Sequence, residues 1–251
     1  MLAVPAHGLP TFGEMAEPMR VLTPEYVPES QFGVWFLGTG TWAKHVLERA
    51  LNDLQRLIPD RRLSYDSVLD VGCGWGHSFK LLDERFAPRR MIGVDTDPHM
   101  LAVSDAAASR AKLSVDLILG SAARIPLPDH STDLIFCHQT FHHLVQQEAV
   151  LREFMRVLKP GGVLLMAEST RRYIHSWIIR LLFHHDMSVQ RTAEEYLAMI
   201  RGAGFRIDPA SISYPYLWWS RPDLGLLERA LGIAPPPGRE ETLINLVAVR
   251  P

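Results

Sequence analysis

Apolar residues along the chain alternate between short continuous runs and stretches at helical spacing. The continuous runs, which are typical of buried strands, fall at 67–72, 91–95, 114–120, 132–137 and 163–169. Helical patterns fall at 77–86, 98–111 and 148–158, the second with Pro98 in its first turn. Apolar strands that alternate with helices predict a parallel sheet covered on both faces.

The flanking segments extend this pattern. A helix is predicted from about Thr41 to Pro59, and residues 159–162, Lys-Pro-Gly-Gly, predict the end of a helix and a turn. Later, a helical pattern at 193–205 lies ahead of two further strands, around 207–214 and 243–250. The sequence predicts an α/β fold: a Rossmann-like, doubly wound sheet of seven mostly parallel strands.

Two stretches do not fit a plain alternation of strands and helices. Residues 1–59 predict a proline-rich arm and a cap helix, while 60–251 form the main domain. Within that domain, residues 170–191 follow the fifth strand and hold Tyr173, Trp177, Phe183 and three histidines. An insertion with so many bulky groups predicts a lid or a substrate wall.

Composition narrows the class of protein. The chain has 251 residues, 47% of them hydrophobic, and 26 basic against 28 acidic residues leave a net charge of -2. This balance argues against disorder and against a dedicated nucleic-acid binder. No apolar run approaches the roughly 20 residues that span a bilayer, and the start lacks a secretory pattern, so we expect a cytoplasmic protein.

A glycine-rich loop carries the strongest local signal. Gly72, Gly74 and Gly76 follow a buried strand and lead into a helix, and Asp95 ends the next strand about 20 residues later. Glycines let a backbone approach a ligand closely, and a carboxylate at Asp95 suits ribose hydroxyls. The spacing is G-x-G-x-G, not the G-x-G-x-x-G of dinucleotide enzymes. Asp70 beside the loop would repel a pyrophosphate but suits a cationic, amino-acid-bearing ligand such as S-adenosylmethionine.

Four ordered segments then resemble a known family. Residues 68–76, 93–98, 120–144 and 151–168 are similar to the motifs of class I S-adenosylmethionine-dependent methyltransferases. The resemblance lies within the group that includes the ubiquinone- and menaquinone-biosynthesis methyltransferases, and it is close over 66–169. It implies a metal-independent enzyme with S-adenosylmethionine as its cofactor.

The resemblance also assigns roles to individual positions. The implied cofactor-binding set is Asp70, Gly72, Cys73, Gly74, Gly76, Asp95, Thr96, Ser121, Ala122 and His138. Within it, the glycines shape the loop under the methionyl part, Asp95 holds the ribose, and Thr96 flanks the adenine. Ser121 and Ala122 lie along the adenine edge, although the family often has an aspartate where this chain has Ser121. His138 faces the methionyl group.

Histidines after the fourth strand are the candidates for catalysis. His138 and His142 could act as general bases, because a histidine near its unperturbed pKa suits that task. The alternative is contact with the cofactor or substrate for His138, and a structural role for His142 and His143. Methyl transfer needs a base only if the acceptor must lose a proton. Much of the rate acceleration can come from positioning the acceptor and excluding water.

A bound metal is not expected. His175, His184, His185 and Asp186 show no second ligand pair at metal spacing, and adjacent histidines point in different directions on a helix. Cys73 and Cys137 are expected to be buried structural thiols.

Aromatic residues supply candidates for a substrate pocket. We expect Trp35, Phe36, Tyr173 and Trp177 to line it, and Trp42 to belong to the core. Trp218 and Trp219 are candidates for a dimer contact, so the chain is expected to be a monomer or a homodimer.

The functional hypothesis is methyl transfer to a small, apolar or aromatic molecule in a covered pocket. The alternatives are an RNA or protein methyltransferase, which the lack of a basic patch disfavours, and a non-catalytic S-adenosylmethionine-binding module. No nucleic-acid or membrane partner is expected.

Overall fold

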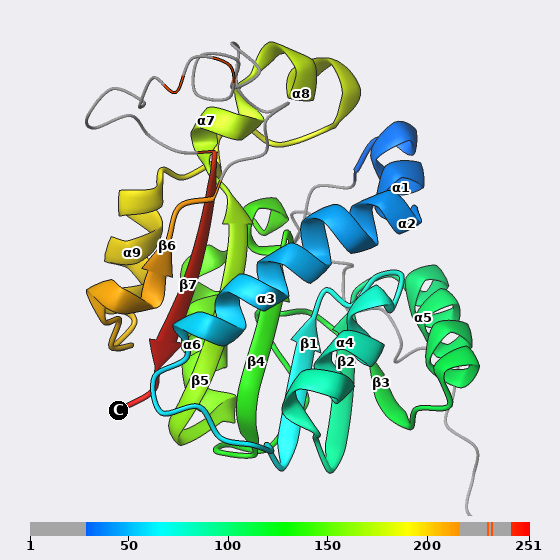
Figure 1. The fold of residues 1–251 in the computed structure, drawn as a ribbon, viewed down its shortest axis with the longest axis vertical. Coiled ribbons are helices and arrows are strands. Elements are labelled where there is room, and N and C mark those ends of the chain that lie inside the picture. Colours follow the sequence, from blue (N-terminus) through cyan, green and yellow to red (C-terminus); the bar gives the residue numbers. More distant parts are fainter. Residues whose placement is uncertain (1–28, 216–229, 231, 233–241) are drawn as a thin grey trace, which may run out of the picture.

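A seven-stranded sheet in the order β3-β2-β1-β4-β5-β7-β6 forms the centre of the protein (Figure 1). The computed structural model describes residues 29–215, 230, 232 and 242–251. The strands are β1 Ser67–Val71, β2 Arg90–Asp95, β3 Val115–Leu119, β4 Thr132–His138, β5 Leu158–Ser169, β6 Ile212–Ser213 and β7 Leu243–Val249. Strands β1 to β5 pair in parallel, and β7 runs antiparallel between β5 and β6. The predicted fold class is confirmed.

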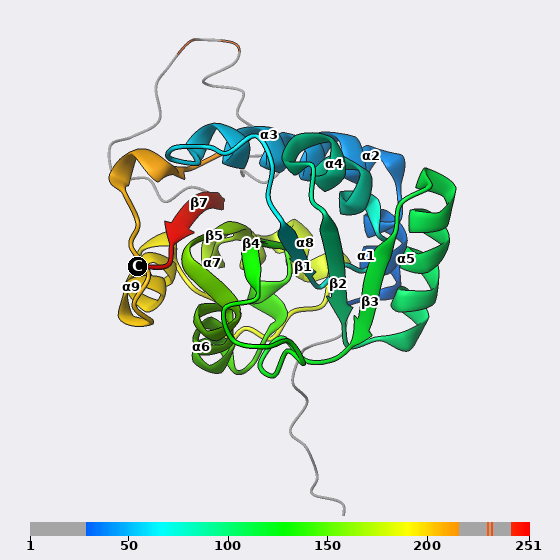
Figure 2. The same cartoon turned by 90° about the horizontal axis from the view of Figure 1, so that it is seen from below.

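Two hydrophobic cores cover the two faces of the sheet, because successive side chains of a strand point to opposite faces. Leu69, Ile135 and Leu164 belong to one core, whereas Val68, Leu134 and Leu165 belong to the other. Figure 2 shows α3 and α4 on one face of the sheet and α6 on the other. The first core includes Phe154 of α6 and Tyr196 of α9, both fully buried.

The main helices begin and end where local signals place them. Their bounds are α3 Glu48–Leu57, α4 His77–Phe86, α5 Pro98–Ala111, α6 Gln147–Val157 and α9 Ala193–Gly202. Asp97 caps α5 by accepting from the His99 amide, with Pro98 in the first turn. Thr192 and Glu195 form a reciprocal capping box at the start of α9.

The turn predicted at 159–162 lies inside a strand. Helix α6 ends at Val157, and β5 begins immediately at Leu158, which pairs with Thr132 of β4. The register then shifts, so that Val163 pairs with Leu134. Gly161 absorbs this irregularity with a φ of 74°, a left-handed conformation that favours glycine.

The N-terminal part begins as a helix earlier than the sequence pattern predicts. Helix α1, Gln31–Leu37, is capped by Ser30, and α2, Gly40–Trp42, is capped by Thr39. A π-helical turn at Ala43–Leu47 then joins α2 to α3. Leu47, Leu51 and Leu54 share a core with α4 and the sheet, so this segment packs as part of the main body. The proposed boundary at 59/60 stays a prediction, and the arm over residues 1–28 lies outside the described residues.

The insertion at 170–191 lies beyond the carboxyl ends of the parallel strands (Figure 1). It contains α7, Arg171–Ile174, and α8, Trp177–Leu182. Its far end contacts the N-terminal helices: Ser30 Oγ donates to the Leu182 carbonyl over 2.7 Å, and Phe32 and Phe183 pack edge to face at 5.5 Å. Trp218 and Trp219, the candidates for a dimer contact, lie outside the described residues. Among the described helices, none is both long and apolar enough to traverse a bilayer.

Candidate cofactor and acceptor site

The main cavity, of about 400 Å³, opens at the carboxyl ends of β1 to β4. Strand order reverses between β1 and β4, the point at which open α/β sheets bind ligands. Its size falls in the range of small-molecule and cofactor sites, roughly 300–1,000 Å³. Its lining includes all of the predicted cofactor-binding residues except Gly76: Asp70, Gly72, Cys73, Gly74, Asp95, Thr96, Ser121, Ala122 and His138.

The glycine loop turns sharply at the end of β1. Gly72 and Gly74 have φ values of 71° and 45°, and the amides of Gly72 and Cys73 both donate to the Val94 carbonyl. A Cβ atom on Gly72 would lie 2.4 Å from Thr140 Oγ1, so this position accepts only glycine without rearrangement. The fold therefore presents bare backbone to the cavity at Gly72 and Gly74.

Gly76 has a different role from the other two loop glycines. A Cβ at this position would lie 3.0 Å from Ser104 Cα and 3.1 Å from Ala107 Cβ, both in α5. Gly76 also caps α4 with a φ of 68°. It serves close packing of α4 on α5, which corrects its expected place under the ligand.

Asp95 ends β2 with its carboxylate held by backbone amides. Oδ2 accepts from the Gly74 amide over 2.9 Å, and Oδ1 accepts from the Asp97 amide over 3.0 Å. Each carboxylate oxygen has a further acceptor site. Asp95 is thus fixed at the cavity wall with capacity left for two ligand hydroxyls.

Asp70 is buried at the floor of the cavity. Its Oδ2 accepts a hydrogen bond from Ser78 Oγ. Burial raises the pKa of Asp70 to about 7, while the Ser78 bond opposes that shift and the charge of Asp95 adds to it.

The cavity has an acidic character. Asp70, Asp95 and Asp97 all line it, and its described lining contains no lysine or arginine. A pyrophosphate would meet uncompensated like charge here, whereas a cationic ligand would be stabilised. Charge therefore favours the sulfonium and ammonium groups of S-adenosylmethionine over a dinucleotide.

His138 stands at the end of β4 with one ring nitrogen facing no protein partner. Its ring lies against Phe136 and Trp42, with centroids 5.8 Å and 5.2 Å away. Nε2 is buried and has no hydrogen-bond partner among the described residues, and the same holds for Nε2 of His77, which also lines the cavity. Buried polar atoms without a partner are rare, so they suit a site that a ligand completes.

Burial also sets the protonation of His138. Loss of hydration, with a smaller contribution from His142, lowers the pKa of the His138 imidazole to about 3. The ring is neutral at physiological pH and a weak base. This favours ligand contact over the role of general base.

A side cavity of about 60 Å³ adjoins the main cavity, and Glu29, Leu37, Trp42, Gln139 and His143 line both. The rest of its described lining is largely apolar and comes from the N-terminal helices, the insertion and β7: Phe36, Val46, Tyr173, Ile174, Ile179, Phe183 and Leu243, together with His142, Ser169 and His185. The insertion and the N-terminal helices thus wall the space next to the main cavity.

His142, the second predicted catalytic residue, lines the side cavity and not the main one. Its Nδ1 lies 2.7 Å from Glu168 Oε2, and both side chains are buried. Glu168 also accepts from the amides of Thr140 and Phe141. Burial lowers the pKa of His142 and raises that of Glu168. The sequence does not predict a role for Glu168, because it is a single polar residue within an apolar strand.

The structure separates the four predicted substrate residues. Phe36 and Tyr173 line the side cavity. Trp35 and Trp177 are 63% and 72% exposed and line neither cavity, because α1 and α8 turn those faces outward. This corrects the expectation for Trp35 and Trp177. Trp42, expected in the core, lines both cavities while it packs against the second core.

Both cysteines are free and buried, as expected. The two cysteines lie near one another in the sheet, because Val71, two residues before Cys73, pairs with Cys137. The thiols of Cys73 and Cys137 nevertheless contact different side chains. Cys73 Sγ lies 4.0 Å from Ser104 Oγ, and Cys137 Sγ lies 3.8 Å from Glu168 Oε1. Burial raises the pKa of each thiol, so neither is an activated nucleophile.

Known proteins match the middle part of the chain. The family described as "Methyltransferase domain" matches residues 69–166, which include the glycine loop, Asp95 and most of β5. This segment of the chain is therefore similar to S-adenosylmethionine-dependent methyltransferases. The family resemblance and the cofactor, both predicted from the sequence, are confirmed.

Individual methyltransferases match over part of their length. A Mycolicibacterium smegmatis protein, named a probable S-adenosylmethionine-dependent methyltransferase, is 38% identical over 47% of this chain and 42% of its own. A demethylmenaquinone methyltransferase of Listeria monocytogenes is 33% identical over 49% of this chain and 54% of its own. The chain thus spans about half the length of these curated relatives.

Solved structures extend the likeness in fold beyond the matched segment. A chain of the Haloferax volcanii complex between the Trm112 methyltransferase activator and a methyltransferase superposes with a TM-score of 0.62. It covers 90% of this chain and 99% of its own, at 21% identity. At that identity the likeness concerns the fold alone.

Proposed function

We propose that the chain transfers a methyl group from S-adenosylmethionine to a small, apolar or aromatic acceptor. The observation that carries the proposal is the adjacency of two unlike spaces. An acidic cavity over a glycine loop adjoins a mostly apolar side cavity, and the two share Trp42 and Gln139. This arrangement offers a donor site in the main cavity and, in the adjoining side cavity, space for the apolar part of an acceptor.

Residues of the main cavity would hold the donor. Asp95 would accept from the ribose hydroxyls, and the backbone at Gly72 and Gly74 would lie under the methionyl part. Asp70 and His138 would complete that end, and Ser121 and Ala122 would flank the adenine. When bound, S-adenosylmethionine supplies a methyl group activated by its sulfonium for in-line displacement.

The chain's contribution to the reaction would be positioning and exclusion of water. The N-terminal helices and the insertion both wall the side cavity, with Phe36 and Phe183 packed edge to face at 6.1 Å. We propose that the insertion serves as the lid of the acceptor site. Because His138 is a weak base, the acceptor would lose its proton to another group or after transfer.

A screen for release of S-adenosylhomocysteine tests this function. Small phenols, quinols, thiols and amines form one panel, and RNA and protein substrates form another. The proposal expects turnover on a member of the first panel, and turnover reduced at least about tenfold by Asp95→Ala when S-adenosylmethionine is not saturating. Turnover confined to RNA or protein would establish the alternative, and S-adenosylmethionine binding without turnover on either panel would support a non-catalytic module.

A further inference from the structure

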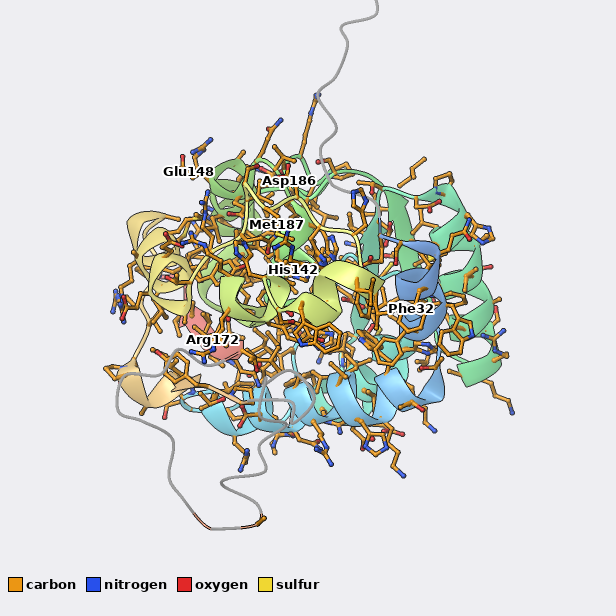
Figure 3. The ribbon with its side chains drawn as sticks, turned by 90° about the horizontal axis from the view of Figure 1, so that it is seen from above. Phe32, His142, Glu148, Arg172, Asp186 and Met187 are labelled. Atoms are coloured by element: carbon orange, nitrogen blue, oxygen red, sulfur yellow. The ribbon has the colours of Figure 1, made fainter. Side chains whose placement is uncertain are left out.

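Three histidines from distant parts of the sequence converge at the side cavity. One candidate ligand atom from each of His142, His143 and His185 lies within 4.8 Å of the others. His142 and His143 follow β4, whereas His185 follows α8. Figure 3, which labels His142 together with Asp186 and Met187, looks down on this end of the molecule.

A carboxylate from a third segment of the chain completes the group. Glu29, just before α1, is oriented through Oε1, which accepts from the amides of Ser30 and His184 at 2.6 Å and 2.7 Å. Its Oε2 lies 3.8 Å from His185 Nε2 and 4.0 Å from His143 Nε2. The side chains of Glu29 and His185 are only 11% and 4% exposed.

These separations are too long for hydrogen bonds but close to those of ligands around one ion. Direct N–H···O bonds span about 2.7–3.2 Å. Two ligand atoms each about 2.0–2.1 Å from a tetrahedral zinc ion lie roughly 3.3 Å apart. To share an ion, Glu29 Oε2 needs to approach the two histidine nitrogens by under about 1 Å, and the histidine ligand atoms need to approach one another by up to about 1.5 Å. Nδ1 of His185 is buried without a partner among the described residues, so the contacts within the cluster do not satisfy every hydrogen-bonding atom of its histidines.

His142 is already oriented as metal-bound histidines usually are. Its Nδ1 faces Glu168 at 2.7 Å, which leaves Nε2 as the atom free to coordinate. A carboxylate behind a ligand histidine fixes the ring and its tautomer. Glu168 is itself fixed by the amides of Thr140 and Phe141.

We propose that His142, His143, His185 and Glu29 form a binding site for a divalent transition-metal ion, with Zn²⁺ as the ion of this class that fits best. Three imidazoles and one carboxylate form a borderline donor set, and four ligands suit the tetrahedral preference of zinc. The site is separate from the donor cavity's glycine loop and does not depend on the proposed function. It reverses the expectation of no metal, which rested on the spacing of ligands along the sequence.

Such an ion would join three segments of the chain. Glu29 belongs to the N-terminal segment, His185 to the insertion, and His142 and His143 to the sheet. One ion, bound at the wall of the side cavity, would hold the N-terminal segment and the insertion against the sheet.

Cobalt substitution tests the site directly. The full-length, tag-free protein is stripped with chelator and titrated with CoCl₂, and visible absorption is recorded. We expect one equivalent to produce the intense bands of tetrahedral Co²⁺, and ZnCl₂ to displace them. Absence of these bands from the wild-type protein overturns the proposal.

Matched variants localise the ion. His185→Ala should weaken Zn²⁺ binding at least about 100-fold, since even loss of an outer-sphere partner costs about 10–100-fold. His184→Ala, at the exposed neighbouring position, should bind as the wild type does. His185→Cys, which retains a ligand, should restore binding and guards against a folding defect in His185→Ala. Equal affinities in His185→Ala and His184→Ala contradict the assignment.

Discussion

The backbone amide of Gly74 donates a hydrogen bond to Oδ2 of Asp95 over 2.9 Å. This contact joins the two strongest sequence motifs, because the loop after β1 is held by the carboxylate that ends β2. The Gly72 amide adds a second connection by donating to Val94, also in β2. The loop and the proposed ribose-binding residue therefore form one preorganised unit.

Replacing Asp95 should affect binding through both of its roles. Asp95→Ala removes charge-assisted hydrogen bonds worth about 1.5–3 kcal/mol and releases the Gly74 amide. We expect the affinity for S-adenosylhomocysteine to fall at least about tenfold in a calorimetric titration. Asp105→Ala, on the exposed side of α5, is the matched control and should bind normally. Equal affinities in the two variants would show that the ribose assignment is wrong.

Asp70 should make stability depend on pH. Burial raises its pKa from 3.8 to about 7, so between these values the folded protein binds more protons than the unfolded chain. Stability contributed by this group must then fall as pH rises from about 4 to about 7. Asp70→Asn removes the titration but retains an acceptor for Ser78.

Chemical denaturation at pH 5 and pH 8 measures this effect. The free energy of unfolding of Asp70→Asn relative to wild type should grow between pH 5 and pH 8 by at most about 3 kcal/mol, because about two pH units lie between pH 5 and the folded pKa of about 7. A constant difference between the two proteins would show that Asp70 does not titrate between pH 5 and pH 8, which contradicts this prediction.

His138 should contribute contact and not proton transfer. Because its pKa is about 3, it stays neutral from pH 6 to 8. We expect His138→Ala to lower kcat/KM by up to about tenfold, the value of one neutral hydrogen bond. The factor should be the same at each pH. A loss that changes with pH near 6.5 would restore His138 as the base.

Two glycine substitutions separate loop geometry from general packing. Gly72→Ala places a Cβ 2.4 Å from Thr140 Oγ1 on a backbone with φ of 71°, and should cost on the order of 1–3 kcal/mol. Gly202→Ala, at the end of α9, meets nothing within 4 Å and should be neutral or stabilising by up to about 1 kcal/mol. Thermal unfolding should therefore rank Gly202→Ala above wild type or equal to it, with Gly72→Ala below. The reverse order would contradict the loop geometry.

Local patterns predict the sheet and its helices because their signals are short-range. Helices 77–86 and 98–111 match the sequence prediction residue for residue. The segment Leu158–Gly162 was misassigned, since pairing with β4 draws it into the strand despite Pro160 and two glycines. Helix α1 was missed because its seven residues show too little periodicity, although the Ser30 cap signals its start.

The sequence predicts the residues of the donor side of the site better than those of the acceptor side. Donor residues lie in motifs whose backbone geometry is local, so Gly72 and Asp95 could be placed in advance. The acceptor side depends on tertiary packing. Nothing in the sequence distinguishes Phe36, which lines the cavity, from the adjacent Trp35, which is exposed. The approach of His185 to His142 likewise depends on how the insertion folds back, held where Gln190 Nε2 donates to the His142 carbonyl over 3.0 Å.

Calorimetric titration of the wild-type protein tests the central claim, an acidic donor site for S-adenosylmethionine, most directly. S-adenosylmethionine, S-adenosylhomocysteine and NADH are compared under identical conditions. The acidic lining and the fixed Asp95 predict saturable binding of the first two ligands and no binding of NADH. Binding of NADH alone, or no heat with either sulfur ligand, would contradict the account.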